Sequence, residues 1–196
     1  MRVLGITGGI ATGKSTVTKM LAEFGAPTIS ADAIARALLA PGTPTTEAVL
    51  AAFPSCAALE PGRIDRRALA RIIFADAQAR SRVEARMHPP IIEALRVQIA
   101  EWRASSVASA AAAEIPLLFE TGLENDVDEV VVVSCDESVQ RTRLCVRDGI
   151  SQEEAERQIA AQWPLPEKAG RANFVVTTDH GVEDTRRQVA AFWESL

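Results

Sequence analysis

Residues 8–15 read GGIATGKS, and this stretch decides the fold of the chain because it follows the pattern Gly, four residues, then Gly-Lys-Ser/Thr. The apolar run Val3–Thr7 precedes it and predicts a buried strand that meets a tight glycine turn. Apolar residues then recur at helical spacing from Ser15 to Phe24. A strand, a glycine loop and a helix in this order form the context that a phosphate-binding loop needs.

The residue types in this loop predict how it would hold a nucleotide. Gly8 and Gly13 let the backbone turn its amides inward, and the new helix points its N-terminus at a phosphate. Lys14 is expected to reach the β and γ phosphates, and the Ser15 hydroxyl to bind Mg²⁺. The alternative is a glycine turn before a surface helix. The expected nucleotide-binding residues of the loop are Gly8, Gly9, Ile10, Ala11, Thr12, Gly13, Lys14, Ser15 and Thr16.

Short apolar segments alternate with helical stretches along the rest of the chain, which predicts an α/β fold with a five-stranded parallel sheet covered by helices. An alanine run near residue 110 favours a helix by propensity, but we expect a strand there because one is needed to alternate with the helices. The four further expected strands are 28–30, 108–115, 130–133 and 174–177.

Helices are expected between these strands. One opens at Asp32, and the stretch 45–103 is expected to be helical in pieces that prolines break. Asp136 is expected to cap a helix that ends at Gly149. Further helices are expected at 152–162 and over the last fifteen or so residues. The expected breaks within 45–103 are Pro54, Pro61-Gly62 and Pro89-Pro90, and the apolar face of the last helix is Val182, Val189, Phe192, Trp193 and Leu196.

Composition limits the class of protein. The chain has 196 residues, 47% of them apolar, which suits one folded domain and excludes a disordered chain. A net charge of −5 argues against nonspecific nucleic-acid binding. Its three cysteines lack metal-ligand spacing and are expected to be ordinary thiols. No apolar run approaches the roughly 18–20 residues that span a bilayer, so we expect a cytoplasmic protein without membrane contact.

Other motifs decide which nucleotide enzyme to expect. The guanine-binding Asn-Lys-x-Asp and the switch Asp-x-x-Gly, both typical of GTPases, do not occur. A motor-type ATPase would place an acidic pair directly after an apolar strand. Val130–Val133 before Asp136-Glu137 is the best candidate, but Asp136 fits a helix cap better. A small kinase remains, in which a second substrate supplies the attacking hydroxyl.

Such a kinase needs a carboxylate and cations around the transferred phosphoryl group. Asp32 follows the strand 28–30 and should lie at the carboxyl edge of the sheet, beside the loop, although it could simply cap a helix. Arg143 and Arg147 are four residues apart on one expected helix and hence share a face. They suit a mobile lid, and the alternative is a solvated charged face.

Together these residues resemble the dephospho-coenzyme A kinase family along nearly the whole chain. Their order and spacing are more specific than any single short piece beyond the phosphate loop. The segments that carry the resemblance are Thr7–Ile10, Ala31–Arg36, Pro41-Gly42, Arg67–Leu69 with Ile73-Phe74, His88-Pro89, Pro116–Glu120, Arg143–Asp148 and Ala160–Gln162.

The resemblance implies transfer of the γ-phosphoryl group of ATP, with Mg²⁺, to the ribose 3′-hydroxyl of dephospho-coenzyme A. Asp32 would be the general base, and Arg143 with Arg147 would belong to a lid over ATP. His88 and Glu120 would help to bind the acceptor, although His88 could equally be a helix cap or a packed side chain. The resemblance thus implies one kinase domain, with a helical acceptor region at about 32–103 and a lid at about 138–170.

The chain departs from the family pattern at a few positions. Ala11 stands where a further glycine is usual, and its methyl group should be tolerated if φ is negative there. Ser30 replaces a common acidic residue, Asn173 stands where Asp is usual, and residues 178–181 replace a more Asn-rich turn. Two other functions stay open, namely a kinase for another small hydroxyl acceptor such as a nucleoside or nucleotide, and a nucleotide-dependent binding module.

Overall fold

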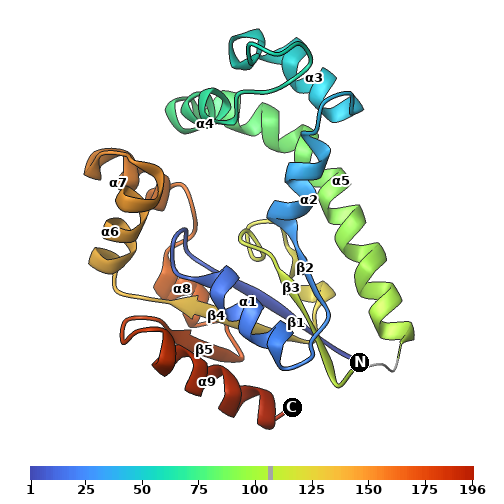
Figure 1. Ribbon diagram of the computed structural model, residues 1–196, viewed down its shortest axis with the longest axis vertical. Coiled ribbons are helices and arrows are strands. Elements are labelled where there is room, and N and C mark those ends of the chain that lie inside the picture. The colour runs from blue at the N-terminus through green and yellow to red at the C-terminus, as the bar shows by residue number, and fades with distance from the viewer. Residues whose placement is uncertain (106–107) are drawn as a thin grey trace. The chain divides into compact units, whose positions relative to one another are not determined.

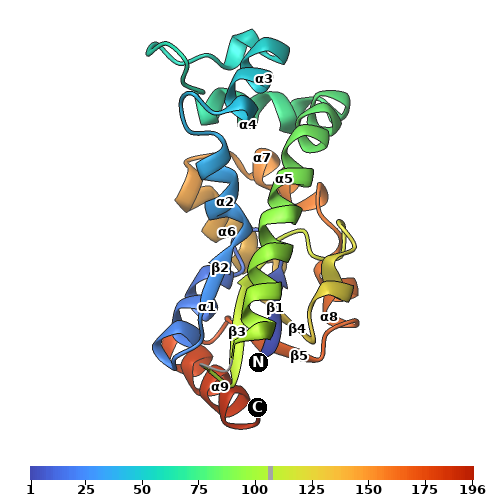
Figure 2. The ribbon, with the colours of Figure 1, turned by 90° about the vertical axis from the view of Figure 1, so that its right-hand side faces the viewer.

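The computed structural model describes residues 1–105 and 108–196. These residues form two compact units, one made of residues 1–30 and 97–196 and the other of residues 31–96. The larger unit contains the sheet and is shown in Figures 1 and 2. Among the described residues, no helix is both long and apolar enough to cross a membrane.

The sheet has five strands, all parallel, in the order β2-β3-β1-β4-β5. The expected fold class is therefore confirmed. The strand order reverses at the central strand β1, because β3 and β2 lie on one side of it and β4 and β5 lie on the other. In open α/β sheets, ligands bind at such a switch point. The strands are β1 Arg2–Gly8, β2 Thr28–Ser30, β3 Ala110–Glu114, β4 Glu129–Ser134 and β5 Phe174–Thr177.

Helices cover both faces of the sheet. Helix α1 (Lys14–Glu23) and helix α9 (Val182–Glu194) lie on one face, and the short α8 (Leu165–Ala169) packs against β1 and β4 on the other (Figure 2). Alternate strand residues point to alternate faces, so Leu4 and Ile6 join the core beneath α1 and α9. That core contains Leu4, Ile6, Val17, Met20, Leu21, Ala26, Ala110, Ala112, Val131, Val133, Val176, Val189 and Phe192.

The alanine run is a strand, as expected against its helix propensity. Ala110–Ala113 are all fully buried between β1 and β2, where a central strand is covered on both faces. Small side chains let α1 lie close to β3. Tertiary burial therefore outweighs the intrinsic preference of alanine, which is worth only a few tenths of a kcal/mol per residue.

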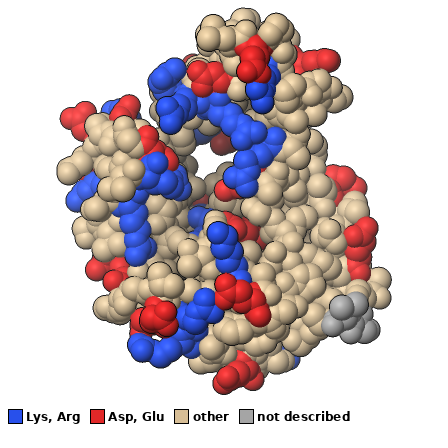
Figure 3. Space-filling view, viewed as in Figure 1, with Lys and Arg blue, Asp and Glu red and all other residues tan. Residues whose placement is uncertain are grey.

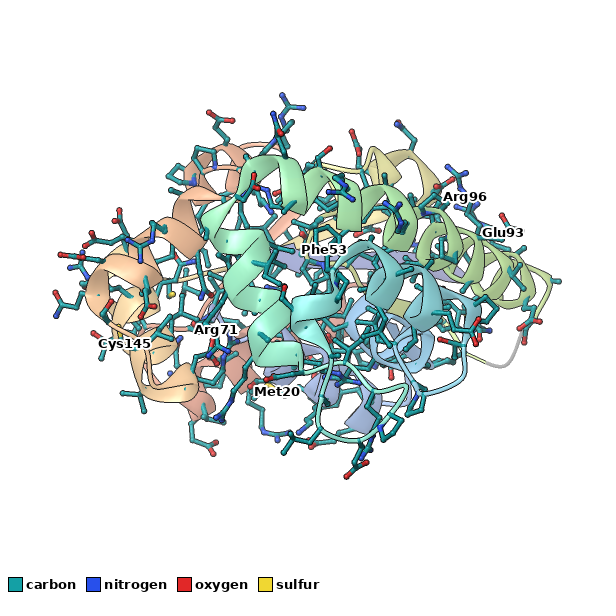
Figure 4. All side chains as sticks on the ribbon, turned by 90° about the horizontal axis from the view of Figure 1, so that it is seen from above. Met20, Phe53, Arg71, Glu93, Arg96 and Cys145 are labelled. Atoms are coloured by element: carbon teal, nitrogen blue, oxygen red, sulfur yellow. The ribbon has the colours of Figure 1, made fainter. Side chains whose placement is uncertain are left out.

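The second unit, residues 31–96, is helical. Its core includes Val49, Phe53, Leu69, Val83 and Met87, and Phe53 lies among its helices (Figure 4). The Arg82 guanidinium lies 4.9 Å from the centre of the Phe53 ring. The helices that begin in this unit are α2 Ala31–Leu38, α3 Pro44–Ala52, the 3₁₀ turn η1 Pro54–Cys56, α4 Arg66–Ala75 and α5 Ala77–Ala104, which continues into the other unit.

Two expectations about the helices are wrong. Pro89 and Pro90 do not break the helical stretch but lie inside the 28-residue helix α5. The helical stretch is instead interrupted at Asp76, between α4 and α5. The Asp76 side chain accepts hydrogen bonds from the amides of Gln78 and Ala79 and so caps the N-terminus of α5. Val182 is 59% exposed and lies outside the apolar face of α9.

The remaining helices follow the expected positions closely. Helix α6 begins after Asp136, which occupies the N-cap position as expected, but its side chain makes no capping hydrogen bond. The helix ends at Gly149, which has the left-handed conformation (φ 66°) of a helix C-cap. Helix α7 begins with a capping box, in which Ser151 and Glu154 satisfy each other's amides. These hydrogen bonds lower the pKa of the Glu154 carboxyl. The bounds are η2 Leu123–Asp126, α6 Glu137–Asp148 and α7 Gln152–Ala160.

Candidate active site

The glycine loop joins β1 to α1 at the centre of the sheet. Gly8 ends β1 with φ 146°, and a Cβ at this position would lie 2.2 Å from the carbonyl oxygen of Val133 on β4. Only glycine therefore lets the chain leave the sheet here. Gly13, with φ 98°, precedes the first turn of α1. The predicted strand, loop and helix are confirmed.

The Lys14 side chain lies over the loop. Its Nζ donates to the carbonyl oxygen of Gly9 at 2.7 Å and to that of Gly8 at 3.3 Å, and the residue is only 8% exposed. The lysine thus holds its ammonium group over the backbone that the motif assigns to phosphate binding. A flexible four-carbon stem allows this point charge to reorient towards a phosphate oxygen.

Ser15 has a carboxylate partner that the sequence pattern did not reveal. Its Oγ donates to Oε1 of Glu114 at 2.7 Å, and Glu114 is 4% exposed at the carboxyl end of β3. The signal available in the sequence was one acidic residue at the end of an otherwise apolar strand. Hydroxyl and carboxylate oxygens are ligands that Mg²⁺ prefers, so this pair fits the expected metal position at Ser15.

Ala11 has a backbone conformation that disfavours a residue with a side chain. Its φ is +60°, so the condition set for tolerance of its methyl group, a negative φ, is not met. For a residue with a Cβ this left-handed conformation costs roughly 1–2 kcal/mol. The loop therefore stores backbone strain at Ala11.

We expect Ala11→Gly to stabilise the protein by about 0.5–1 kcal/mol, because relief of the positive-φ strain exceeds the extra freedom that glycine gives the unfolded chain. Urea denaturation of the two proteins measures the difference. Ala48→Gly on the exposed face of α3 is the matched control and should destabilise by about 1 kcal/mol. A loss of stability in Ala11→Gly comparable to the control would contradict the strain.

The tip of the loop is held by two glutamines from far along the chain. The Ile10 amide donates to Oε1 of Gln162 at 2.8 Å, and Nε2 of Gln140 on α6 donates to the Ile10 carbonyl oxygen at 2.8 Å. Gln140 is 3% exposed. The first half of α6 and the segment just after α7 are therefore bonded directly to the phosphate loop.

Arg143 is connected to the same loop through Thr178. Its Nη1 donates to the Thr178 hydroxyl at 2.8 Å and its Nη2 to the Thr178 carbonyl oxygen at 2.7 Å. The Thr178 hydroxyl in turn donates to the Thr12 carbonyl oxygen at 2.8 Å. Next to them, burial raises the pKa of the Cys135 thiol more than the charge of Arg143 lowers it.

Arg147 does not share the environment of Arg143. Its guanidinium donates twice to the neighbouring Asp148 at 2.8 Å, and these hydrogen bonds lower the pKa of that carboxyl. Its side chain is 54% exposed. Lys and Arg side chains gather on the surface over α6 and α7 (Figure 3). A role of Arg147 towards ATP stays a prediction.

Glu120 belongs to a buried ion pair. Its Oε1 lies 2.7 Å from Nζ of Lys168, which is fully buried, and also accepts from the Trp163 amide at 3.0 Å. Lys168 donates as well to the Pro116 carbonyl oxygen. The Phe119 and Trp163 rings stack 6.1 Å apart. Glu120 thus ties residues 116–120 to α8, and its expected contact with the acceptor stays a prediction.

We expect Lys168→Met to destabilise the protein by about 3 kcal/mol, because it leaves the Glu120 carboxylate buried without its cation. Chemical denaturation measures this loss. The double variant Lys168→Met with Glu120→Gln should lose less, since the remaining group is then neutral. Lys19→Met, on the exposed face of α1, is the control and should stay within about 0.5 kcal/mol. Equal effects of Lys168→Met and Lys19→Met would contradict a structural ion pair.

Asp32 and His88 lie in the helical unit. Asp32 is exposed in the first turn of α2, which follows β2 directly. The expectation that His88 lies at the end of a helical segment is wrong, because the residue lies in the interior of α5. Because Asp32 and Lys14 belong to different units, their convergence on one phosphoryl group stays a prediction.

These features define the class of protein. A five-stranded parallel sheet with a phosphate loop after its central strand is a three-layer P-loop fold, and the markers of GTPases are absent from the sequence. The chain is a P-loop nucleotide-binding protein. No group of three or more His, Cys, Asp or Glu side chains that could hold a metal occurs in the described part of the chain.

Comparison with known proteins identifies the family. A family model described as dephospho-CoA kinase matches residues 2–184. A dephospho-CoA kinase of Geobacter metallireducens is 45% identical over 194 residues, which cover 99% of this chain and 96% of the relative. The chain belongs to the dephospho-CoA kinase family, as the resemblance implied, and is therefore a phosphotransferase.

Solved structures agree with this assignment. A Thermus thermophilus protein with 35% sequence identity superposes with a TM-score of 0.78 and covers 100% of this chain and 97% of its own. A dephospho-CoA kinase from Campylobacter jejuni, 26% identical, gives a TM-score of 0.68 with the same two coverages. These matches favour the dephospho-CoA kinase over a kinase for another acceptor.

Proposed function

We propose that this chain transfers the γ-phosphoryl group of ATP to the ribose 3′-hydroxyl of dephospho-coenzyme A in the cytoplasm, and that the phosphate loop and Asp32 carry out the transfer. The observation that carries the proposal is the family match over residues 2–184, together with a complete phosphate loop at the switch point of the sheet. The named roles rest on the chemistry of the side chains that the loop and its neighbours present.

In the proposed reaction, Asp32 accepts the proton of the 3′-hydroxyl as its oxygen attacks the γ-phosphorus. The new P–O bond forms while the bond between the γ-phosphorus and the bridging oxygen of ADP breaks, and ADP leaves with that electron pair. Lys14 neutralises charge on the β and γ phosphates, and Arg143 supplies a second cation. Most of the catalysis is positioning and charge stabilisation.

Ser15 and Glu114 would hold a divalent cation, Mg²⁺ in this proposal. Bound there, the ion would neutralise charge on the β and γ phosphate oxygens. The support is the 2.7 Å hydrogen bond between the Ser15 hydroxyl and a buried carboxylate that could orient this hydroxyl or a water molecule next to it.

We expect Ser15→Ala to weaken the binding of ADP in the presence of Mg²⁺ about tenfold and to leave binding of ADP in EDTA nearly unchanged, because only the metal contact is lost. Glu114→Gln should show the same split. Titration calorimetry measures both affinities. Thr18→Val is the control on the same helix, because the buried Thr18 hydroxyl has no hydrogen-bond partner among the described residues. Equal losses with and without Mg²⁺ would contradict a metal role.

The charge of the helical unit supports an anionic acceptor. Residues 31–96 contain nine arginines against seven Asp and Glu, although the whole chain has a net charge of −5. Part of this positive charge gathers over α4 (Figure 3). Dephospho-coenzyme A carries a diphosphate, which a surplus of arginine side chains would attract, whereas a nucleoside carries no charge there.

Coupled measurement of ADP release tests the proposed function. Purified protein with Mg²⁺ and ATP should release ADP much faster when dephospho-coenzyme A is added, and mass spectrometry should find one added phosphate on the acceptor. Adenosine and other nucleosides should stimulate at least a hundredfold less. Faster phosphorylation of a nucleoside would assign another acceptor, and nucleotide binding without any stimulated ADP release would indicate a binding module.

A further inference from the structure

Two carbonyl groups of the phosphate loop are held by side chains outside the motif. The Ile10 carbonyl oxygen accepts from Nε2 of Gln140, and the Thr12 carbonyl oxygen accepts from the hydroxyl of Thr178, both at 2.8 Å. Gln140 and Thr178 are more than nine-tenths buried. They lie 130 and 166 residues from their partners in the sequence.

The direction of a carbonyl group determines the direction of the next amide. In a planar trans peptide, the C=O of one residue and the N–H of the following residue point in opposite directions. A hydrogen bond that holds the Ile10 carbonyl against α6 therefore turns the Ala11 N–H away from α6. The bond from Thr178 to Thr12 does the same for the Gly13 N–H.

Both of these amides are available to a ligand. Within residues 1–105 and 108–196, neither the Ala11 nor the Gly13 N–H donates a hydrogen bond to another protein atom. Successive unpaired amides at a helix N-terminus form an anion-binding nest. Ala11 keeps its orientation despite the strain of φ +60°, so the surrounding bonds must hold it there.

We propose that Gln140 and Thr178 are positioning residues, which aim the Ala11 and Gly13 amides at the phosphates of the nucleotide. The proposal rests on the proposed function only as far as nucleotide binding. Gly9 is part of the same arrangement, because a Cβ at this position would lie 2.5 Å from Nε2 of Gln140 and displace the amide group. The motif thus provides the amides, and two distant side chains provide their direction.

The Thr178 hydroxyl makes two hydrogen bonds at once: it donates to the Thr12 carbonyl oxygen of the loop and accepts from Nη1 of Arg143. The same hydroxyl therefore orders a loop amide and a lid arginine.

Thr178→Val tests the proposal, because valine keeps the shape of threonine and removes the hydroxyl. We expect ADP in EDTA to bind about tenfold more weakly, with KM for dephospho-coenzyme A unchanged. Thr178→Ser restores the hydroxyl and should recover most of the affinity. Thr185→Val is the matched control, because the hydroxyl of this buried threonine of α9 donates to the Gly181 carbonyl oxygen and to no atom of the phosphate loop among the described residues. It should lose stability but bind ADP normally.

Gln140→Met removes the other hydrogen bond and preserves side-chain length. We expect a similar loss of ADP affinity, and the double variant with Thr178→Val should bind ADP more weakly than either single variant, because each substitution affects a separate amide. In wild-type protein, ADP should shift the amide NMR signals of Ala11 and Gly13. Gln140→Met should reduce the shift at Ala11 and Thr178→Val the shift at Gly13.

An Arg143→Gln background separates the two contacts of Thr178. The effect of Thr178→Val on ADP affinity should persist there, because the bond to the Thr12 carbonyl oxygen does not need the guanidinium. Disappearance of the effect in this background, or wild-type ADP affinity in Thr178→Val with a stability loss like that of Thr185→Val, would overturn the proposal. A wild-type protein that binds no ADP would instead overturn the proposed function.

Discussion

Lys14→Ala is expected to lower kcat/KM for ATP by a factor of about 10³ or more, which corresponds to roughly 4 kcal/mol of transition-state stabilisation. In the proposed mechanism, the Lys14 ammonium group neutralises charge on the transferred phosphoryl group. Nζ contacts the carbonyl oxygens of Gly8 and Gly9, which a water molecule could reach in the variant, so the fold should remain intact. Circular dichroism and urea denaturation check this.

Two further variants sharpen the lysine test. Lys19→Ala removes an exposed lysine of the same helix and should leave kcat/KM within a factor of two. Lys14→Arg keeps the charge but replaces a compact ammonium by a bulkier planar guanidinium at a position that is only 8% exposed. It should remain at least a hundredfold impaired. Near-normal turnover of Lys14→Ala would remove the loop lysine from the mechanism.

Asp32→Asn is expected to reduce kcat by about 10²–10⁴, because the amide has the shape of the carboxylate but cannot accept the proton of the acceptor hydroxyl. KM for ATP and for dephospho-coenzyme A should change by less than about threefold, since no charge that binds the phosphates is removed. Steady-state kinetics with each substrate varied measure this split. The exposure of Asp32 in the first turn of α2 makes a change in stability small.

Asp65→Asn is the matched control for this variant. Asp65 caps helix α4 in the same unit, where its Oδ1 accepts from the amides of Arg67 and Ala68. Asparagine caps helices about as well as aspartate, so stability and turnover should both be retained. Full activity of purified Asp32→Asn would assign proton acceptance to another group and leave Asp32 as a helix residue.

Local sequence patterns predicted most of the elements because local forces determine them. Four adjacent β-branched residues made β4 recognisable, and Gly149 ended α6 where a left-handed residue was needed. The pattern failed at Pro89-Pro90, where a long helix continues past residues that lack an amide hydrogen. The packing of α5 stabilises the helix by more than the two missing backbone hydrogen bonds of the prolines cost. Local sequence rules do not include this packing energy. The short helix α8 was missed for the same reason, since its buried Lys168 pairs with a distant carboxylate.

The sequence by itself determined the phosphate loop and the parallel α/β sheet, because each depends on the order of residues within a short window or on the alternation of such windows. It also indicated the kinase family, through the order and spacing of motifs along nearly the whole chain. Tertiary structure alone decided which distant side chains form hydrogen bonds with that loop. Ser15 meets Glu114 across 99 residues, Ile10 meets Gln140 across 130, and Thr12 meets Thr178 across 166. The physical reason is that a parallel sheet brings the carboxyl ends of separate strands, and the helices that follow them, to one edge. A single glutamate, glutamine or threonine has no signature until the chain has folded around it.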